Sequence, residues 1–512
     1  MKKTIRSYVD YQAETRPDAV YLVAPESRQT MSFGELQRSS RRLARALAAR
    51  GLKPGDKIAM LMPNGYQTCR LFIGIMYSGF CVTPVNLLAQ PTQLAYVIEH
   101  CDTHIVFVSP DQLERLNQAI AQVPREIEVI VVHPDCSEFI EDQNGVDAAN
   151  GNLYSVTETD DALMMYTSGT TGTPKGVMLS NRSVVAGGEN VSSAHQLGPD
   201  DRVMAVLPLY HINAQIVTAT SPLIHGGSLV MPHRFSVMSF WESVVEHRCT
   251  WINVVPTIIA YLINGTSPKT MGLDISRVKF CRSASAPLAP SHHLAFEEKF
   301  GIGIIETMGL TETAAPCFTN PLDPTQRKIG SPGQPFGNEA KIIDANGETL
   351  PPRQTGEIRG RGNHVMSGYY KNPEETAKSH TGEGWLHTGD LGHLDEDGFV
   401  FVTGRIKELI IKGGENIAPR EIDEVLMKHP AVLEAAAVGI PDDNYGQEII
   451  ACLILKPGAT CNADELREYC ESALGPYKTP KQFHIVEDLP KGPSGKVQRL
   501  KLIDLVRRPS MN

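Results

Sequence analysis

The sequence predicts an α/β protein in two parts: a large N-terminal domain of layered sheets and helices over residues 1–405, and a small α+β C-terminal domain over residues 406–512. Short apolar runs alternate with helical stretches up to about Gly404, which is typical of layered α/β proteins. At that point the composition changes to a segment rich in charged residues and glycine, GRIKELIIKGGENIAP. The length of 512 residues also fits about three compact units, or one large domain carrying a smaller one.

The N-terminal elements follow from local signals. Ser32 and Glu35 form a capping-box pattern, and apolar residues then recur at helical spacing until Gly51 ends the helix. A strand is expected next at 57–62. Further strands are expected at 105–108, 129–132, 203–207 and 228–231. Residues 71–98 lack formal charge, but glycines and prolines interrupt them, which favours a buried helix and a strand over a membrane span.

The C-terminal elements begin with a helix that has Pro419 in its first turn and Ile422, Val425 and Leu426 on one face. Strands are expected at 435–439 and 449–455, and a helix at 463–474. A hinge between the two parts is expected at Arg405 to Glu408.

Composition excludes several classes of protein. The 48 Lys and Arg against 58 Asp and Glu give a net charge of −10, which disfavours nucleic acid as a partner. The first residues contain no apolar stretch long enough for a signal peptide, so we expect a cytoplasmic protein. The ten cysteines are widely and irregularly spaced without a CxxC pair, which predicts reduced, mostly buried thiols.

The segment from Tyr166 to Gly176, YTSGTTGTPKG, carries the strongest chemical signal. Its glycines and hydroxyl residues expose N–H and O–H donors that can surround phosphate oxygens, and Lys175 adds positive charge. The pattern differs from the P-loop of NTPases, because Pro174 precedes the lysine and no Ser or Thr follows it. The residues expected to bind phosphate are Thr167, Ser168, Gly169, Thr170, Thr171, Gly172 and Lys175.

This string resembles the phosphate-loop signature of the acyl-adenylate-forming superfamily, which includes acyl-CoA synthetases, peptide-synthetase adenylation domains and beetle luciferases. Four further motifs follow in the family's order. ETMGLTE at 306–312 resembles the adenine and magnesium motif, and GWLHTGD at 384–390 resembles the ribose motif. GRIK at 404–407 resembles the hinge, and GPSGKVQR at 492–499 resembles the terminal lysine motif. The resemblance covers essentially the whole chain.

The resemblance implies an enzyme that uses ATP, Mg²⁺ and coenzyme A. Lys496 resembles the family lysine that bridges the carboxylate and the α-phosphate, where two anions must meet and positive charge must be fixed. Glu312 and Thr171 match the metal site, which suits hard oxygen ligands. His211 matches the residue between the acid and thiol channels, with a packed structural histidine as the alternative.

The nucleotide and thiol contacts are implied in the same way. Asp390 suits the ribose hydroxyls and Arg405 the sugar or a phosphate, and a structural salt bridge between the two is the alternative. Gly413 and Gly414 would let a pantetheine arm approach the backbone, or they form a plain turn. The small domain is expected to be mobile. The adenine is expected to contact Ser285, Ala286, Thr307, Met308, Gly309 and Thr311, with Met308 where the family usually has an aromatic ring.

The segments that line the acid pocket in the resembling family are polar here: His211, Asn213, Gln215, Asn253, Arg282, Ser283 and Thr307. A fatty-acid tunnel would be apolar. We therefore expect a short polar or anionic acid of the oxalate, malonate or sulfoacetate kind. Arg282 or Arg234 would supply the counter-charge, although a core or surface role for either stays open.

The expected function is thus an AMP-forming carboxylate CoA ligase whose partners are a small carboxylic acid, ATP and CoA. The alternatives are an aryl or medium-chain fatty acid ligase, an enzyme that loads a carrier protein, a luciferase-like oxidase, and a nucleotide-binding regulator without chemistry. Family members often form dimers, and no self-complementary patch in the sequence decides whether this chain does.

Overall fold

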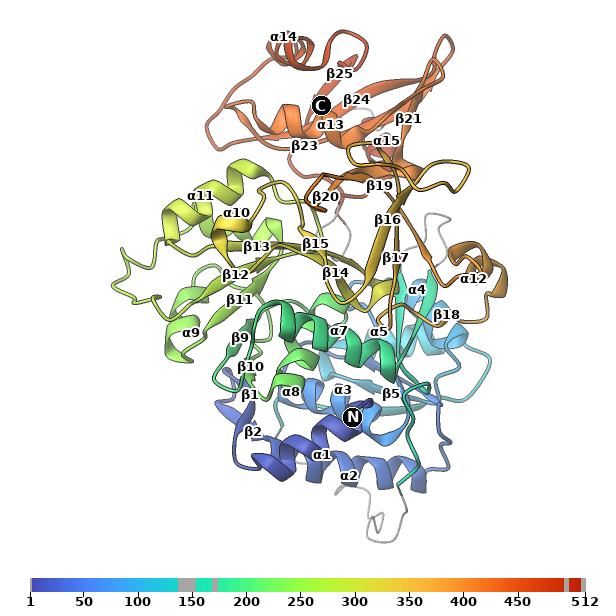
Figure 1. Ribbon diagram of the computed structural model, residues 1–512. Coiled ribbons are helices and arrows are strands. Elements are labelled where there is room, and N and C mark those ends of the chain that lie inside the picture. Colours follow the sequence, from blue (N-terminus) through green and yellow to red (C-terminus); the bar gives the residue numbers. More distant parts are fainter. Residues whose placement is uncertain (1, 137–152, 168–173, 492–496, 508–512) are drawn as a thin grey trace.

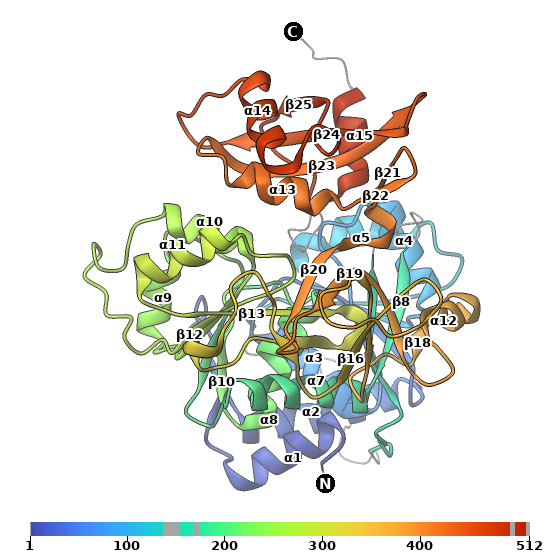
Figure 2. The same ribbon diagram turned by 45° about the horizontal axis from the view of Figure 1, so that its top comes forward.

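The computed structural model describes residues 2–136, 153–167, 174–491 and 497–507. These residues form layered sheets and helices up to Arg405 and a smaller unit of mixed sheets and helices beyond it, which confirms the expected fold class. Figures 1 and 2 show the smaller unit, in orange and red, stacked on one end of the larger.

Two large sheets build the N-terminal part of the described chain. The first has the strand order β15-β14-β13-β12-β11-β9-β10-β1-β2 and is parallel through its centre. Its strands are β1 (Val20–Ala24), β2 (Gln29–Ser32), β9 (Arg202–Ala205), β10 (Ser228–Val230), β11 (Trp251–Val254), β12 (Phe280–Ser283), β13 (Ile304–Leu310), β14 (Ala315–Thr319) and β15 (Gln334–Pro335).

The second sheet has the order β18-β8-β7-β4-β3-β5-β6. Its strands are β3 (Lys57–Leu61), β4 (Cys81–Pro84), β5 (Ile105–Val108), β6 (Glu128–Val131), β7 (Asp161–Thr167), β8 (Lys175–Ser180) and β18 (Gly368–Tyr369). β7 and β8 pair in antiparallel fashion, with Thr167 opposite Lys175, so the ends of the predicted phosphate loop lie side by side.

Helices α3 (Tyr66–Ser78) and α7 (Asn181–Ala194) contact strands of both sheets and so form a middle layer. Figure 1 shows other helices on the two outer sides. The remaining helical segments of this part are α1 (Ile5–Thr15), α2 (Phe33–Ala49), α4 (Pro91–His100), η1 (Pro110–Gln112), α5 (Leu113–Ile120), η2 (Asn213–Thr220), α8 (Ser221–His225), α9 (Phe240–Glu246), α10 (Pro256–Asn264), α11 (Pro290–Phe300), η3 (Thr311–Thr313), η4 (Pro324–Gln326) and α12 (Pro373–Ser379).

Local sequence signals locate the N-terminal elements well. The hydroxyl of Ser32 accepts from the Glu35 amide at 3.2 Å, and the Glu35 carboxylate accepts from the Ser32 amide at 2.7 Å, so the predicted capping box begins α2. The strands expected at 57–62, 105–108, 129–132, 203–207 and 228–231 correspond to β3, β5, β6, β9 and β10 within a residue or two.

The charge-free segment is confirmed as a buried helix and a strand. Every residue of α3 is buried, because the helix lies between the two sheets, and β4 follows it directly. The end of the segment begins a further helix, α4, which the sequence analysis did not separate. In the described part of the chain, no helix combines the length and the apolar character that crossing a membrane requires.

A four-stranded sheet connects the large part to the small one. It has the order β16-β17-β19-β20, with β16 (Glu339–Ile343), β17 (Gly356–Arg361), β19 (Leu386–Leu394) and β20 (Val400–Arg405). A single 3₁₀ turn, η5 (Ile406–Glu408), follows β20 where the hinge is expected.

The C-terminal unit has its own hydrophobic clusters, built from residues 410–506. Its predicted elements are all present, although the strand pair is longer than expected because the two strands form one continuous hairpin. The elements are β21 (Ile410–Lys412), β22 (Glu415–Ile417), α13 (Pro419–Met427), β23 (Val432–Asp442), β24 (Gly446–Leu455), α14 (Ala463–Leu474), β25 (Gln482–Ile485) and α15 (Arg499–Arg507). All ten cysteines lie in the described residues and all are free thiols, eight of them buried.

Gly187 lets α7 approach the turn after η3. A Cβ at Gly187 would lie 2.2 Å from the backbone oxygen of Ala314, two residues after Glu312. We predict that Gly187→Ala lowers the free energy of unfolding by about 1–3 kcal/mol, since overpacking forces the backbone apart. Urea unfolding monitored by tryptophan fluorescence measures this. Gly198→Ala, where nothing lies within 4 Å of the new Cβ, is the control and should leave the midpoint unchanged; equal midpoints for both variants would contradict the prediction.

Candidate active site

A cavity of about 270 Å³ lies between the two parts of the chain. The large part contributes residues 285–289, 306–310, Asp390 and Arg405, and the small part contributes Arg420, Asp423, Val497 and Arg499. Four of the five motifs therefore have described residues at one cavity. The predicted adenine residues Ser285, Ala286, Thr307, Met308 and Gly309 all line it.

The two adenine-side segments are fixed by backbone geometry. Ser285 has a φ of +75°, which turns the chain sharply after β12, and its hydroxyl accepts a hydrogen bond from the Asn213 side chain at 3.1 Å. Gly309 lies against the next strand, where a Cβ would stand 2.3 Å from the Ala315 carbonyl oxygen. Thr307 is buried and Met308 half-buried on β13, so the Met308 thioether is available to a flat ligand.

Glu306, at the start of this motif, is buried against the cavity. One carboxylate oxygen accepts from the Leu288 amide at 3.3 Å, and the other has no hydrogen-bond partner in the described part of the chain. Burial raises the pKa of Glu306 to about 7, while the nearby Arg420 guanidinium acts to lower it. The sequence analysis did not single out this residue, although it stands first in the motif.

The residues on either side of the predicted phosphate loop lie on paired strands, Thr167 on β7 and Lys175 on β8. Lys175, the first residue of β8, forms an ion pair with Glu375 of α12, and its ammonium lies 5.2 Å from the centre of the Tyr369 ring. The hydrogen bond from Lys175 lowers the pKa of Glu375. The predicted phosphate ligands Ser168, Gly169, Thr170, Thr171 and Gly172 lie outside the described residues.

Glu312 lies on η3, close to the start of β8. The Tyr369 hydroxyl donates to its carboxylate at 3.0 Å, and the side chain is half-exposed. A half-exposed carboxylate with one hydrogen bond retains lone pairs for a hard cation, so the donor set fits Mg²⁺. Thr311, also on η3, is half-exposed but is not part of the cavity lining.

Asp390 and Arg405 form the salt bridge that was the structural alternative. They lie directly opposite each other on β19 and β20, with Nε of Arg405 2.6 Å from the Asp390 carboxylate. The Asp390 charge raises the pKa of Arg405. Both residues also line the cavity, so the pair presents a fixed acceptor and a fixed cation to a ligand.

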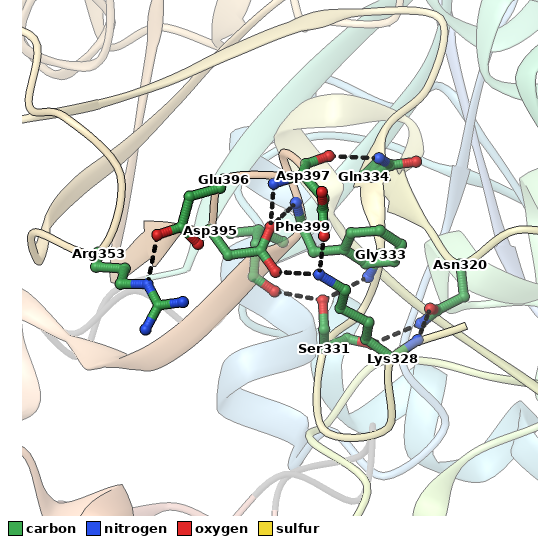
Figure 3. A network of polar contacts seen from close by, with 11 residues as sticks. Asn320, Lys328, Ser331, Gly333, Gln334, Arg353, Asp395, Glu396, Asp397 and Phe399 are labelled. Atoms are coloured by element: carbon green, nitrogen blue, oxygen red, sulfur yellow. Dashed lines mark hydrogen bonds and ion pairs between the residues drawn. The ribbon is translucent and has the colours of Figure 1, made fainter. Parts of the chain in front are cut away.

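A polar network joins the turn of this hairpin to the segment that follows β14 (Figure 3). Lys328 forms ion pairs with Asp395 and Asp397 in the turn between β19 and β20. The Lys328 amide donates to the Asn320 side chain at 3.1 Å, and the backbone and side-chain N–H groups of Asn320 donate to the Glu306 carbonyl at 3.1 and 3.3 Å. The β19–β20 hairpin and β13 are therefore connected through Lys328 and Asn320.

A buried polar cluster lies behind Ser285. Nη1 of Arg282 donates to the side-chain oxygens of Asn213 at 3.1 Å and Asn253 at 2.9 Å, and Asn213 in turn donates to Ser285. Within residues 2–136, 153–167, 174–491 and 497–507, no carboxylate forms an ion pair with Arg282, and its Nε has no hydrogen-bond partner. Burial lowers the pKa of Arg282 to about 9.

The structure also places other predicted residues. His211 precedes η2 and packs on Tyr210, and Gln215 donates to the Leu209 carbonyl at 2.8 Å. Arg234 is exposed in the segment after β10. Gly413 and Gly414, with φ of +55° and +88°, form the two-residue turn between β21 and β22, so hairpin geometry alone accounts for both glycines.

Lys496 lies outside the described residues, but both ends of its loop are placed. Lys491 and Val497 line the cavity. Arg499, three residues after Lys496, is half-buried and bonds Glu408 of η5, Asp423 of α13 and the Ala437 carbonyl. Burial acts to lower the pKa of Arg499, but its ion pairs with Asp423 and Glu408 raise it.

Comparison with known proteins assigns the family. Residues 9–370 match the model of the AMP-binding enzyme family, and residues 421–496 match the AMP-binding enzyme C-terminal domain. The chain belongs to the AMP-binding enzymes. This confirms the resemblance to the acyl-adenylate-forming superfamily that the motifs suggested.

Three relatives show how far the similarity of this AMP-binding enzyme extends. A sulfoacetate–CoA ligase of Cupriavidus necator is 52% identical over 501 residues, which covers 98% of this chain and 97% of that protein. An oxalate–CoA ligase of Arabidopsis thaliana is 33% identical over 469 residues, covering 90% of each. The ATP-bound crystal structure of MatB from Rhodopseudomonas palustris superposes with a TM-score of 0.89 at 28% identity and 99% coverage of both chains.

Sequence reasoning missed three residues. Tyr369 bonds Glu312, Glu375 pairs with Lys175, and Arg420 lines the cavity. Glu375 is 200 positions from Lys175, its partner, and no motif relates the two. Arg420 lies in an ordinary amphipathic helix, and its position at the cavity follows only from how that helix packs.

We predict that Asn320→Ala loosens β13 of this AMP-binding enzyme. The change leaves the Lys328 amide and the buried Ser331 carbonyl without their partner, which should cost about 1–3 kcal/mol in unfolding free energy. Nucleotide affinity, measured by titration calorimetry, should fall as well. Asn346→Ala, in the exposed turn after β16, is the control. Unchanged stability and affinity in the Asn320 variant would show that the network does not brace the site.

Proposed function

We propose that this protein is an AMP-forming acid–thiol ligase that joins a short anionic carboxylic acid, of the sulfoacetate, oxalate or malonate kind, to coenzyme A. The observation that carries the choice of acid is the buried Arg282 guanidinium, which has no carboxylate partner among the described residues and whose network reaches the cavity through Ser285. The 52% identity to a sulfoacetate–CoA ligase supports the same choice.

The proposed reaction has two steps at one site. A carboxylate oxygen of the acid attacks the α-phosphorus of ATP, the bond from that phosphorus to the β-phosphate oxygen breaks, and diphosphate leaves. The CoA sulfur, having lost its proton, then attacks the acyl carbon, the bond from that carbon to the AMP oxygen breaks, and AMP leaves. Bringing two anions together in the first step requires fixed positive charge, which the second step no longer needs.

The residues at the cavity suit the first step. Asp390 would accept from the ribose hydroxyls, and Arg405 and Lys175 would donate to sugar or phosphate oxygens. Lys496 would neutralise the carboxylate and the α-phosphate together, since both flanks of its loop meet the cavity. Glu312, with Thr171, would hold Mg²⁺, which supplies charge neutralisation on the triphosphate when bound.

The acid would lie between the α-phosphate position and Arg282, with its second anionic group toward the guanidinium. Hydrogen bonds to neutral amides recover only part of the cost of desolvating a buried arginine, and an anion that pairs with it recovers more of that cost. A fatty acyl chain would leave this charge uncompensated, which disfavours the fatty-acid alternative. Arg234 is exposed and is the weaker choice for the counter-charge.

Several finer assignments belong to the same proposal. We divide the chain into an adenylate-forming domain at 1–405 and a lid domain at 406–512, in keeping with the separate hydrophobic clusters beyond residue 410. His211 as a gate, Gly413 and Gly414 as the pantetheine path, a homodimer and a cytoplasmic location stay predictions from the sequence.

We predict that the protein releases diphosphate from ATP and Mg²⁺ with sulfoacetate, oxalate or malonate, and forms acyl-CoA when CoA is present. Lys496→Ala should slow acyl-adenylate formation about 100- to 1000-fold, because the charge at the developing bond is lost. Lys501→Ala, on the exposed side of α15, should match the wild type. Coupled diphosphate release and mass spectrometry of the thioester are the measurements, and release only with aryl or long-chain acids would overturn the choice of acid.

We predict that Arg282→Met lowers kcat/KM for the anionic acid by on the order of 100-fold, since one partner of a buried charge pair is removed. Unfolding free energy should change by less than about 2 kcal/mol, because the unpaired charge is itself costly to bury. Arg234→Met is the matched control and should keep wild-type kinetics. If Arg234→Met loses the anionic acid and Arg282→Met does not, the assignment of the counter-charge is wrong.

The Arg282 guanidinium also predicts how kcat/KM for the anionic acid depends on pH. Its pKa of about 9 in the free protein means that kcat/KM for the anionic acid should fall as the pH rises through about 9, where the cation is lost. The profile of Arg282→Met should lack this limb. If kcat/KM of Arg282→Met falls at high pH in the same way as that of the wild type, the ionisation belongs to another group.

A further inference from the structure

Arg420 makes a hydrogen bond that crosses between the two parts of the chain. It is the second residue of α13, which Pro419 begins. Its Nη1 donates to the Val402 carbonyl of β20 at 2.6 Å, and its Nε donates to the Glu424 carboxylate, one turn along α13, at 2.7 Å. The Arg420 side chain is only 14% exposed, which limits the access of water to its bond with Val402, whereas Glu424 is 42% exposed and its bond with Arg420 lies nearer the surface.

This bond closes one side of the cavity. Val402 lies three residues before Arg405 on β20, and Val402, Arg405 and Arg420 all line the cavity. The positive charge of Arg420 also acts across the cavity on the buried Glu306 carboxyl and lowers its pKa, against the effect of burial. Arg420 therefore connects the two parts of the chain in two ways: by its hydrogen bond to Val402 and by its electrostatic attraction to Glu306.

The rest of the small unit is tied to α13. Arg499, at the start of α15, pairs with Asp423 on α13 and with Glu408 in η5. The segment that begins at Val497 and the helix that carries Arg420 are thus held as one body. Whatever fixes α13 against β20 also fixes the segment next to Lys496 at the cavity.

We propose that Arg420 is a positioning residue that holds the C-terminal unit over the cavity for acyl-adenylate formation and is not needed for thioester formation. The proposal rests on the proposed two-step function. In the first step Lys496 must stay beside two anions, so the unit has to remain docked on β20. In the second step that charge is no longer required, and the Arg420 bond to Val402 is dispensable.

The test measures the two half-reactions separately. Arg420→Met should slow single-turnover formation of acyl-AMP from ATP and acid by about 10- to 100-fold, the equivalent of one buried charge-assisted hydrogen bond. Transfer from purified acyl-AMP to CoA should stay within about twofold of wild type. Glu424→Gln removes only the negative charge of the partner within α13 and should leave both steps near wild type, and Arg420→Lys should recover part of the first.

A distance measurement separates this proposal from the proposed function. Spin labels attached through a keto amino acid at positions 276 and 443, both exposed, report the spacing of the two parts. The distribution should be narrow in the wild type and broad in Arg420→Met. An unchanged distribution, or an equal loss in both half-reactions, overturns the positioning role. Failure of wild type to form acyl-AMP with any acid overturns the proposed function, whereas the distance result still decides the role of Arg420.

Discussion

A guanidinium buried without a carboxylate partner is the constraint on which the acid side of the site depends. In the described residues Arg282 is bonded to the amide oxygens of Asn213 and Asn253, so the protein solvates this charge without neutralising it. Such an arrangement is costly in isolation, and a ligand with a second negative charge relieves the cost. The same network ends at Ser285, on the wall of the nucleotide cavity, which connects the choice of acid to the place where it reacts.

On the side proposed for the nucleotide, several charges of the described residues already have partners. Asp390 and Arg405 pair across β19 and β20, Lys175 pairs with Glu375, and Lys328 braces the hairpin turn. Paired charges hold fixed positions before the substrate arrives, which favours an ordered ATP site. The small unit completes the lining of the cavity. Its hydrogen bond from Arg420 to the Val402 carbonyl of β20 is a contact that motion of the unit can break.

Much of the fold and the motif positions could be predicted because they depend on local sequence. Each of these signals is contained in a few residues: the capping box of Ser32 and Glu35, the apolar runs of the strands, and the change in composition near Gly404. The five motifs could be found for the same reason. What the sequence could not give is long-range pairing: Glu375 lies 200 residues from Lys175, and the bond from Arg420 ends on a backbone carbonyl that has no sequence signal. Arg282 could be named but not distinguished from Arg234, because only burial separates them.

The most direct test of the central claim compares an anionic acid with its neutral isostere. Sulfoacetate and 3,3-dimethylbutyrate differ mainly in the charge of a tetrahedral end group of similar size, so their ratio of kcat/KM isolates the contribution of the buried cation. The account predicts that the wild type prefers sulfoacetate by about 100-fold or more, as expected for pairing with a desolvated guanidinium. Equal rates, or a preference for the neutral acid, would contradict it.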